Sequence, residues 1–422
     1  MTSSGVSPAA RSAWTTPQIA VLGLVVLAGV VARLALLPTR GLAGDIDQFI
    51  VWVHHISLNG LGNAYDQNLT FGPVMAFVWA VIGAADPAFR TITNGSDPAV
   101  SAIMKLPASL ADIATGLLVA YALRARPRWA IVGAASILLH PAVIDVSAWW
   151  GQYESIYLLT ALGAVLLAGS GHNGWAAAAI ALSLLTKPQA LVLLPPFAAW
   201  FWATGGWRGL ARAAAIGGGV ILLLWLPFVP AGGPLNYLRN IGEYQGEIFN
   251  VLSVRAWNSW WLVQEAVAGG AFVRDDSAIL GPLTLRHVGY GLAGLLELAI
   301  AAAIVQRPTT RTLILGLTAS VLVFFAFATQ MHERYAFGAL VFLALLVEKP
   351  AARWLSIAFG VVFTLNLLAA IPPTPEIGAL LPVTGPLGIV GSITILAITA
   401  AAMRWLVATP PGPGAAPSPR GP

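Results

Sequence analysis

The stretch GDIDQFIVWVHH, residues 44–55, places two carboxylates and two imidazoles directly after the first long apolar segment of the chain. Asp45 and Gln48 lie three residues apart and Gln48 and Trp52 lie four apart, so a helix gathers these side chains on one face. The opposite face is apolar and contains Ile46, Phe49, Ile50 and Val53. The pattern predicts an amphipathic helix at a membrane surface. The alternative is an ordinary loop after a membrane-spanning helix, with both acids simply solvated.

The composition of the whole chain indicates a membrane protein. Of its 422 residues, 58% are hydrophobic and only 9% are charged, whereas soluble proteins carry about 25% charged residues. The apolar runs last about 17–25 residues, which is the length that an α-helix needs to cross hydrocarbon. We therefore predict an all-α polytopic membrane protein with about 12 transmembrane helices, within a range of roughly 11–13.

Several classes of function are excluded by composition and by missing motifs. The net charge of +5 comes from arginines in loops, which fits orientation in a membrane and predicts no nucleic-acid partner. The chain has no cysteine, so disulfides, thiolate metal sites and a cysteine nucleophile are ruled out. It also lacks a P-loop and a GxGxxG motif that follows a strand, so no nucleotide site is expected.

The apolar segments predict a single transmembrane domain over residues 17–406. A short polar lead, residues 1–16, should be cytoplasmic, and the Pro/Gly-rich tail, residues 407–422, has the composition of disordered segments. Two outer loops with interfacial helices are expected, at residues 39–69 and 231–282. Apart from such helices, residues 231–282 should be the longest non-helical stretch.

Positively charged loop residues predict the orientation of the chain. The positive-inside rule places these residues on the inner side: Arg208, Arg212, Arg307, Arg311, Lys349, Arg353 and Arg404. Residues 39–69, residues 231–282 and the turn at residues 331–335 then lie outside. One conflict remains, because a count of twelve crossings puts three arginines of the segment 124–128 outside as well.

Ionisable side chains within or beside apolar segments are candidates for function, because burying them in a membrane is costly. Four clusters qualify, and each has a structural alternative. Gln152 and Glu154 follow two tryptophans that fit an aromatic interface belt, and Lys187 interrupts an apolar run, where it can also snorkel. The other two clusters are His332-Glu333-Arg334-Tyr335, which can simply pin two helix ends, and Arg255-Ala256-Trp257-Asn258, which fits an interfacial helix.

Together these clusters predict an outward carboxylate with cations near the same surface. Transfer of a sugar from a lipid-linked phosphate needs this combination, because a carboxylate deprotonates the acceptor hydroxyl while cations stabilise the departing phosphate. The pair Asp45 and Asp47 can also hold a divalent ion, but the chemistry requires no metal or other cofactor.

The clusters also resemble motifs of the GT-C glycosyltransferases. Within that family, they are most similar to the branch that contains the dolichyl-phosphate-glucose-dependent glucosyltransferases of N-glycan assembly and their bacterial relatives. Gly44-Asp45 followed by Trp52 is similar to the first-loop motif of that branch. Five further stretches resemble later motifs in the same order: Leu139-His140-Pro141, Trp150-Gly151-Gln152-Tyr153-Glu154, Lys187-Pro188-Gln189, Arg255-Ala256-Trp257-Asn258 and His332-Glu333-Arg334-Tyr335. The chain departs from the branch at Phe71-Gly72-Pro73, in place of Tyr-Pro-Pro, and at His140, in place of Asn.

The resemblance implies a GT-C-type bundle that moves a hexose, glucose or mannose, from a polyprenyl-phosphate donor to a glycan or glycolipid acceptor. It implies that Asp45 is the catalytic base of an inverting reaction and that His332 and Arg334 lie near the donor phosphate. The other residues expected to bind substrate are Asp47, Trp52, Gln152, Glu154, Lys187, Arg255 and Glu333. The expected location is the bacterial plasma membrane, with the site facing outward.

Two other classes of protein fit part of the sequence. Kinked helices with buried Lys and Asp side chains also occur in transporters of lipid-linked or anionic substrates, whose sites lie near the bilayer midplane. A non-catalytic membrane scaffold is the third alternative. The gathering of charges at one membrane face, without a detectable inverted repeat, favours the enzyme.

Overall fold

The computed structural model describes residues 14–408, so most of the predicted lead at 1–16 and of the tail at 407–422 lies outside the described residues. Seven described helices are long and apolar enough to cross a membrane, judged by length and composition. They are α1 (Thr16–Leu36), α4 (Pro98–Ala122), the helical stretch Pro188–Ala231, α12 (Leu285–Gln306), α13 (Thr310–Phe327), α15 (Pro350–Ala370) and α17 (Pro386–Ala408). The protein is thus a nearly all-α, multi-span membrane protein.

An eighth span is present if α5 (Pro127–Leu138) and the helical stretch Pro141–Trp150 count as one element with a bend of 48°. That stretch consists of α6 (Pro141–Ile144) and the π-helical η3 (Asp145–Trp150). Three apolar helices are shorter: α3 (Pro73–Ala85), α7 (Glu154–Gly169) and α8 (Asn173–Leu184). The count is therefore seven or eight, and the figure of about twelve crossings stays a prediction.

The long stretch Pro188–Ala231 is not one straight rod. It contains η4 (Pro188–Leu193), α9 (Leu194–Trp225) and η5 (Leu226–Ala231), and α9 breaks at Gly206, where φ is 58° and ψ is −157°. A Cβ added at Gly209 would lie 2.7 Å from the carbonyl oxygen of Phe201, although residues eight apart in a straight helix are separated by about 12 Å. The chain therefore folds back at Gly206.

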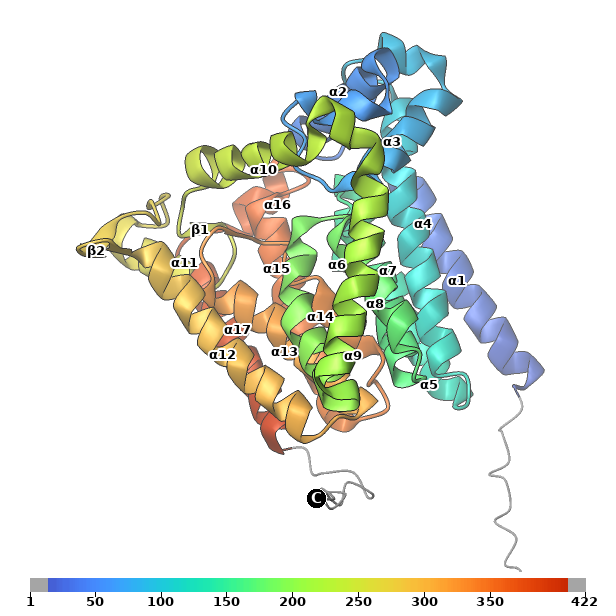
Figure 1. The fold of residues 1–422 in the computed structure, drawn as a ribbon, viewed down its shortest axis with the longest axis vertical. Coiled ribbons are helices and arrows are strands. Elements are labelled where there is room, and N and C mark those ends of the chain that lie inside the picture. Colours follow the sequence, from blue (N-terminus) through green and yellow to red (C-terminus); the bar gives the residue numbers. More distant parts are fainter. Residues whose placement is uncertain (1–13, 409–422) are drawn as a thin grey trace, which may run out of the picture.

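One end of the bundle is covered by short helices (Figure 1). Residues 44–55 are helical as predicted, within α2 (Ala43–Asn59), and the predicted apolar face is buried. Helices α2, α3 and α10 (Gly233–Glu243) lie at this end, whereas the first residue of α1 and the last of α17 lie at the opposite end. The remaining short elements near α2 are η1 (Leu61–Asp66) and η2 (Pro87–Arg90).

The loop at residues 231–282 contains helices, as expected from the sequence. They are α10, the π-helical η6 (Tyr244–Ile248) and α11 (Ser259–Ala268). Gly232 in the left-handed conformation and Pro234 in the first turn begin α10, and the side chain of Asn258 caps α11. Hydropathy misses these helices because they are too short or too polar to cross a membrane.

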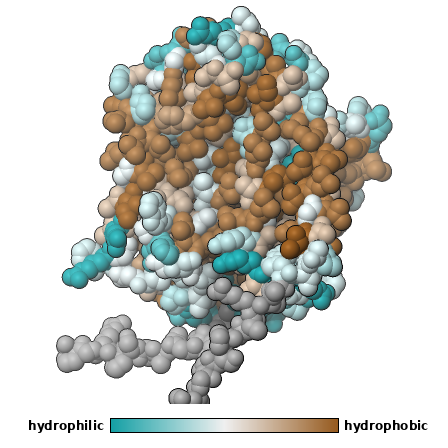
Figure 2. Space-filling view, turned by 90° about the vertical axis from the view of Figure 1, so that its right-hand side faces the viewer, coloured by the Kyte–Doolittle hydropathy of each residue, from teal (hydrophilic) through white to brown (hydrophobic). Residues whose placement is uncertain are grey.

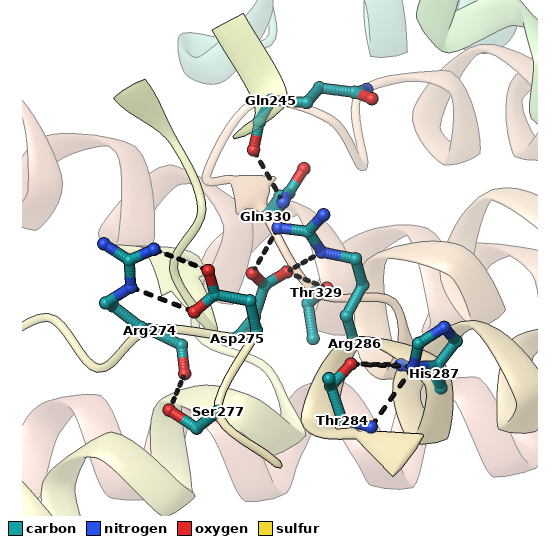
Figure 3. Close-up of polar contacts among 10 residues, drawn as sticks. Gln245, Arg274, Asp275, Ser277, Thr284, Arg286, His287, Thr329 and Gln330 are labelled. Atoms are coloured by element: carbon teal, nitrogen blue, oxygen red, sulfur yellow. Dashed lines mark hydrogen bonds and ion pairs between the residues drawn. The ribbon is translucent and has the colours of Figure 1, made fainter. Parts of the chain in front are cut away.

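Short strands connect this loop to the bundle. Strand β1 (Ser253–Val254) pairs in parallel with β4 (Met331–His332), and β2 (Ala278–Leu280) pairs antiparallel with β3 (Leu283–Thr284). The buried carboxylate of Asp275 accepts two bonds from Arg286 and one from Thr329 (Figure 3). Gln330 donates to the carbonyl oxygen of Gln245 in the same view. The loop is therefore fixed to the ends of α12 and α13.

The core of the bundle is centred on α13 and on α14 (Gly338–Ala344). Most residues of α13 and all residues of α14 are buried. On the face seen in Figure 2, hydrophobic residues form a broad band between two hydrophilic ends. A further short helix, α16 (Pro375–Leu380), lies between α15 and α17 in the chain. The band is the surface that a bilayer would cover.

The basic loops gather at the end opposite α2 and α10. Arg126, between α4 and α5, pairs with Glu348, and the guanidinium of Arg353 lies 4.8 Å from the ring centre of Trp129. The turn at residues 124–128 therefore lies at the same end as Lys349 and Arg353. The expectation that separated these arginines from Lys349 and Arg353 by a membrane is therefore wrong.

Candidate functional site

Asp45 stands in the first turn of α2, at the surface of a large cavity. The chain reaches α2 from α1 through Gly41, which has a φ of +59°. A Cβ at Gly41 would lie 2.1 Å from the carbonyl oxygen of Trp149, so only glycine allows this close approach. The start of α2 is thereby held against the segment 149–152.

The two oxygens of the Asp45 carboxylate have different surroundings. Oδ2 accepts a hydrogen bond from Trp150 Nε1 at 2.8 Å and another from Gln152 Nε2. No donor among residues 14–408 bonds Oδ1. One oxygen is therefore anchored, while the other is available to a molecule in the cavity.

The partners of Asp45 come from a local distortion of the chain. The π-helix η3 ends at Trp150, and the φ of +91° at Gly151 turns the chain so that Trp150 and Gln152 both reach Asp45. A Cβ at Gly151 would lie 2.5 Å from Ile46 Cδ1 on α2. Glycine is therefore required here for backbone conformation and for packing.

Gln152 links Asp45 to a buried ion pair. Its Oε1 accepts a hydrogen bond from Lys187 Nζ at 3.2 Å, and Lys187 Nζ lies 2.5 Å from Glu154 Oε1. All three side chains are buried. Lys187 precedes η4 in extended conformation, where Pro188 starts a new helical turn. The interruption that was visible in the sequence thus brings the lysine to the site.

Arg334 continues the same network. Its Nε lies 3.3 Å from Glu154 Oε1, and its Nη1 donates to Glu333 Oε1 at 3.0 Å. The guanidinium also lies 4.8 Å from the ring centre of Trp150. At this distance the charge of the guanidinium is attracted to the face of the aromatic ring. Residues from four separate parts of the chain therefore form one continuous polar network.

His332 contributes a neutral hydrogen-bond donor. Its Nδ1 is 3.1 Å from Arg334 Nη1, which can only donate, so we assign the proton of the neutral ring to Nε2. Burial, together with the nearby charges of Arg334 and Lys187, holds the pKa of His332 well below its ordinary value. Nε2 is buried without a hydrogen-bond partner in the described part of the chain.

The cavity has a volume of about 810 Å³ and is lined by Asp45, Trp52, Gln152, Lys187, His332 and Arg334. Its other wall is largely apolar and comes from α9, α10, η6, α12 and α13. Two residues of that wall, Leu238 and Ile248, are 64% and 62% exposed. The cavity therefore has a charged side and an apolar side that contains highly exposed residues.

Four of the predicted site residues do not line this cavity: Asp47, Glu154, Arg255 and Glu333. The side chain of Arg255 donates to the carbonyl oxygen of Ala370, although its backbone forms a bridge with His332. Asp47 pairs with Arg40 at 3.0 Å and accepts from the backbone N–H of Gly95, so it fixes a neighbouring loop. Glu333 is buried behind Arg334.

The described residues contain no group of three or more His, Asp or Glu side chains that could hold a metal ion. Sequence reasoning also gave no site role to several polar residues that line the cavity, among them Gln48 and Asn68. Gln48 shares a helix face with Asp45, which was the available signal. Asn68 accepts from Trp52 Nε1 at 3.0 Å, but no local pattern connects residues 16 positions apart on different elements.

Comparison with known proteins gives a distant likeness. No family model and no curated protein matches the sequence. Among solved structures, the chain is similar to the crystal structure of ArnT from Cupriavidus metallidurans bound to undecaprenyl phosphate. The TM-score is 0.48 at 15% sequence identity, over 92% of this chain and 77% of that chain. Function is inferred from the side chains of the site rather than from this likeness.

Proposed function

We propose that this protein is a GT-C-type membrane glycosyltransferase that moves a hexose, glucose or mannose, from a polyprenyl-phosphate donor to a glycan or glycolipid acceptor. The observation that carries the proposal is the polar network from Asp45 to Arg334. It places a carboxylate with one free oxygen, a neutral imidazole and two cationic side chains around one cavity with an apolar wall.

In this reaction Asp45 Oδ1 removes the proton from the acceptor hydroxyl. The acceptor oxygen forms a bond to the anomeric carbon as the bond from that carbon to the phosphate oxygen breaks. A single base supports this direct displacement, which inverts the anomeric configuration. Trp150 and Gln152 keep the second oxygen of Asp45 in place throughout.

The leaving group is the polyprenyl phosphate, which gains negative charge as the bond breaks. Arg334 and the Nε2–H of His332 are the donors assigned to it, because both line the cavity and a guanidinium binds phosphate through charge-assisted bonds. Glu154 and Glu333 hold Arg334 in position. Lys187 is paired with Glu154. We therefore propose that Lys187 orients Gln152 and does not bind the phosphate directly.

The apolar wall fits the polyprenyl chain. A lipid of this kind stays in the bilayer while its phosphate enters the site, so the cavity must open sideways to hydrocarbon. Leu238 on α10 and Ile248 in η6 combine high exposure with a place in the cavity wall. We assign the passage of the chain to this opening, between α9, α10 and η6.

The proposal is tested by donor consumption. The purified protein in sealed proteoliposomes is incubated with a glycolipid extract as acceptor and with short-chain polyprenyl-phosphate-glucose, polyprenyl-phosphate-mannose or the corresponding sugar nucleotides. One polyprenyl-phosphate sugar should be converted to polyprenyl phosphate, and the sugar nucleotides should remain intact. Consumption of the nucleotides alone would contradict the proposal, and translocation of the intact lipid-linked sugar without its cleavage would identify a transporter.

We further propose that α2, α10 and the cavity face the outside of a bacterial plasma membrane, with loops 39–69 and 231–282 on that side of the domain at 17–406. The support is that Arg126, Lys349 and Arg353 all lie at the opposite end. The break at Gly206 and the shorter helices α7 and α8 supply candidates for the additional crossings of a bundle of about 12.

This orientation is open to a direct labelling experiment, because the natural chain has no cysteine. Gln245 near α10 and Ala125 between α4 and α5 are both exposed. In intact cells, a membrane-impermeant thiol reagent should label Gln245→Cys, whereas Ala125→Cys should react only after the membrane is opened. The reverse pattern would invert the orientation.

A further inference from the structure

The outer part of the cavity contains polar groups that the proposed reaction does not use. Asn68 Oδ1 accepts hydrogen bonds from Trp52 Nε1 at 3.0 Å and from Gln48 Nε2 at 3.3 Å. These two bonds identify the oxygen of the Asn68 amide and leave its Nδ2 group without a partner among the described residues. Gln48 Oε1 likewise has no hydrogen-bond partner in residues 14–408.

These free groups lie next to the base along the same helix. Gln48 follows Asp45 by three residues on α2, which is somewhat less than one helical turn of about 5.4 Å. Both residues line the cavity, as does Asn68. A sugar held by the two amides therefore has a neighbouring hydroxyl within reach of Asp45 Oδ1.

The opposite side of this region is supplied by α10. Asn240 Nδ2 donates to the carbonyl oxygens of Gln67 and Leu69, so α10 is tied to the segment that carries Asn68. Glu243 follows Asn240 by three residues, which places both on one helix face, and both line the cavity. Of the five ionisable Asp, Glu, Lys, Arg and His side chains in the cavity lining, Glu243 is the one that α10 contributes.

From this arrangement we infer that Gln48 and Asn68 form an acceptor subsite for an uncharged sugar. An amide oxygen and an amide N–H together match the mixed donors and acceptors of vicinal hydroxyls. Glu243 and Asp45 add negative charge, so a uronic acid or a phosphorylated sugar is disfavoured there. The inference rests on the proposed glycosyl transfer and specifies the acceptor class, which the transfer chemistry alone leaves open.

The decisive variant is Asn68→Asp. Aspartate keeps the oxygen that accepts from Trp52 and Gln48, but it replaces the free N–H donor by a second acceptor. The same segment offers a matched control in Asn63→Asp, because Asn63 bonds the backbone of Asn59 and does not line the cavity. Any effect of Asn68→Asp that is absent from Asn63→Asp therefore belongs to the cavity position and not to an added charge in this segment.

The test combines binding and kinetics with purified protein in nanodiscs. Saturation-transfer NMR compares methyl β-glucoside and methyl α-mannoside with methyl β-glucuronide, and transfer from the polyprenyl-phosphate sugar to the best glycoside is then measured. The wild type should bind a neutral glycoside and not the glucuronide. Asn68→Asp should raise the acceptor KM about tenfold, which corresponds to the loss of one hydrogen bond to a neutral partner, and should change the donor KM less.

The outcomes separate the inference from the proposed function. Equal binding of the glucuronide, unchanged acceptor KM in Asn68→Asp, or an equal rise in both KM values would overturn the acceptor subsite while leaving the transferase in place. If the wild type consumes no polyprenyl-phosphate sugar, the proposed function fails and the subsite inference fails with it.

Discussion

Arg334 is the residue whose chemistry is most sensitive to small changes, because it contacts Glu154 and Glu333 and lies over Trp150. Lysine keeps the charge but lacks the planar fork and stacks poorly. We predict that Arg334→Lys lowers kcat/KM for donor about 10- to 100-fold, the range for one or two charge-assisted bonds. Steady-state kinetics with the donor measures the change.

The matched control for Arg334→Lys is Arg274→Lys in the loop at residues 231–282. Arg274 is exposed and pairs with Asp276, away from the cavity lining. It should leave kcat/KM close to the wild-type value. A loss of melting temperature in Arg334→Lys with normal kinetics at low temperature would reduce Arg334 to a structural role.

Because His332 is buried as a neutral ring, we predict that the stability of the folded protein depends on pH. Burial keeps its folded-state pKa well below the ordinary value, so the unfolded chain binds a proton near pH 6.5 that the folded protein does not. The stability contributed by the neutral ring is therefore present above about pH 6.5 and is lost as the pH falls below it. The melting temperature should drop between pH 7.5 and 5.5, and less steeply in His332→Gln.

The control for this titration is the exposed His172. His172→Gln should keep the wild-type pH dependence of melting temperature. Parallel curves for the wild type and His332→Gln would show that His332 is not the group that titrates.

Among the elements, α1, α4 and α7 meet at a buried charge cluster under the site. Asp112 lies 2.9 Å from Arg33 Nη2 and accepts from Ser147 at 2.5 Å and from Ser155. These serines flank the segment 150–154 that surrounds Asp45. The cluster therefore supports the site from below.

Breaking this pair from one side leaves an uncompensated buried charge. We predict that Asp112→Leu destabilises the protein by about 3–5 kcal/mol, and that the double variant Arg33→Met with Asp112→Leu recovers most of the loss. Thermal unfolding in detergent gives both values. A double variant as unstable as Asp112→Leu alone would contradict the account of the charge pair.

At this scale the sequence predicted much and missed particular features. The helix at residues 44–55 follows from its periodicity. The reversal at Gly206 was hidden, because a hydropathy window averages over a turn between two apolar helices. The bounds of α10 do not follow from hydropathy, because Asn236, Arg239, Asn240 and Glu243 interrupt its apolar residues.

For the whole molecule, the sequence named Asp45, Gln152, Glu154, Lys187, His332 and Arg334, and the fold brings these residues into one network. Their roles stay predictions. Arg255 and Asp47 carry suitable chemistry, but their side chains bond Ala370 and Arg40 instead. Composition cannot predict which of two nearby carboxylates is paired with a residue distant in the sequence. The place of Asn68 in the cavity lining likewise could not be predicted from its neighbours in the sequence.

The central claim is that Asp45 is the base of a polyprenyl-phosphate-dependent transferase, and donor turnover by a pair of matched variants tests it most directly. Asp45→Asn keeps the size of the side chain but removes the proton acceptor, so turnover should fall by about 100-fold or more. Asp47→Asn makes the same change two residues away, outside the cavity lining, and should stay near wild type. Normal turnover by Asp45→Asn together with an inactive Asp47→Asn would contradict the account.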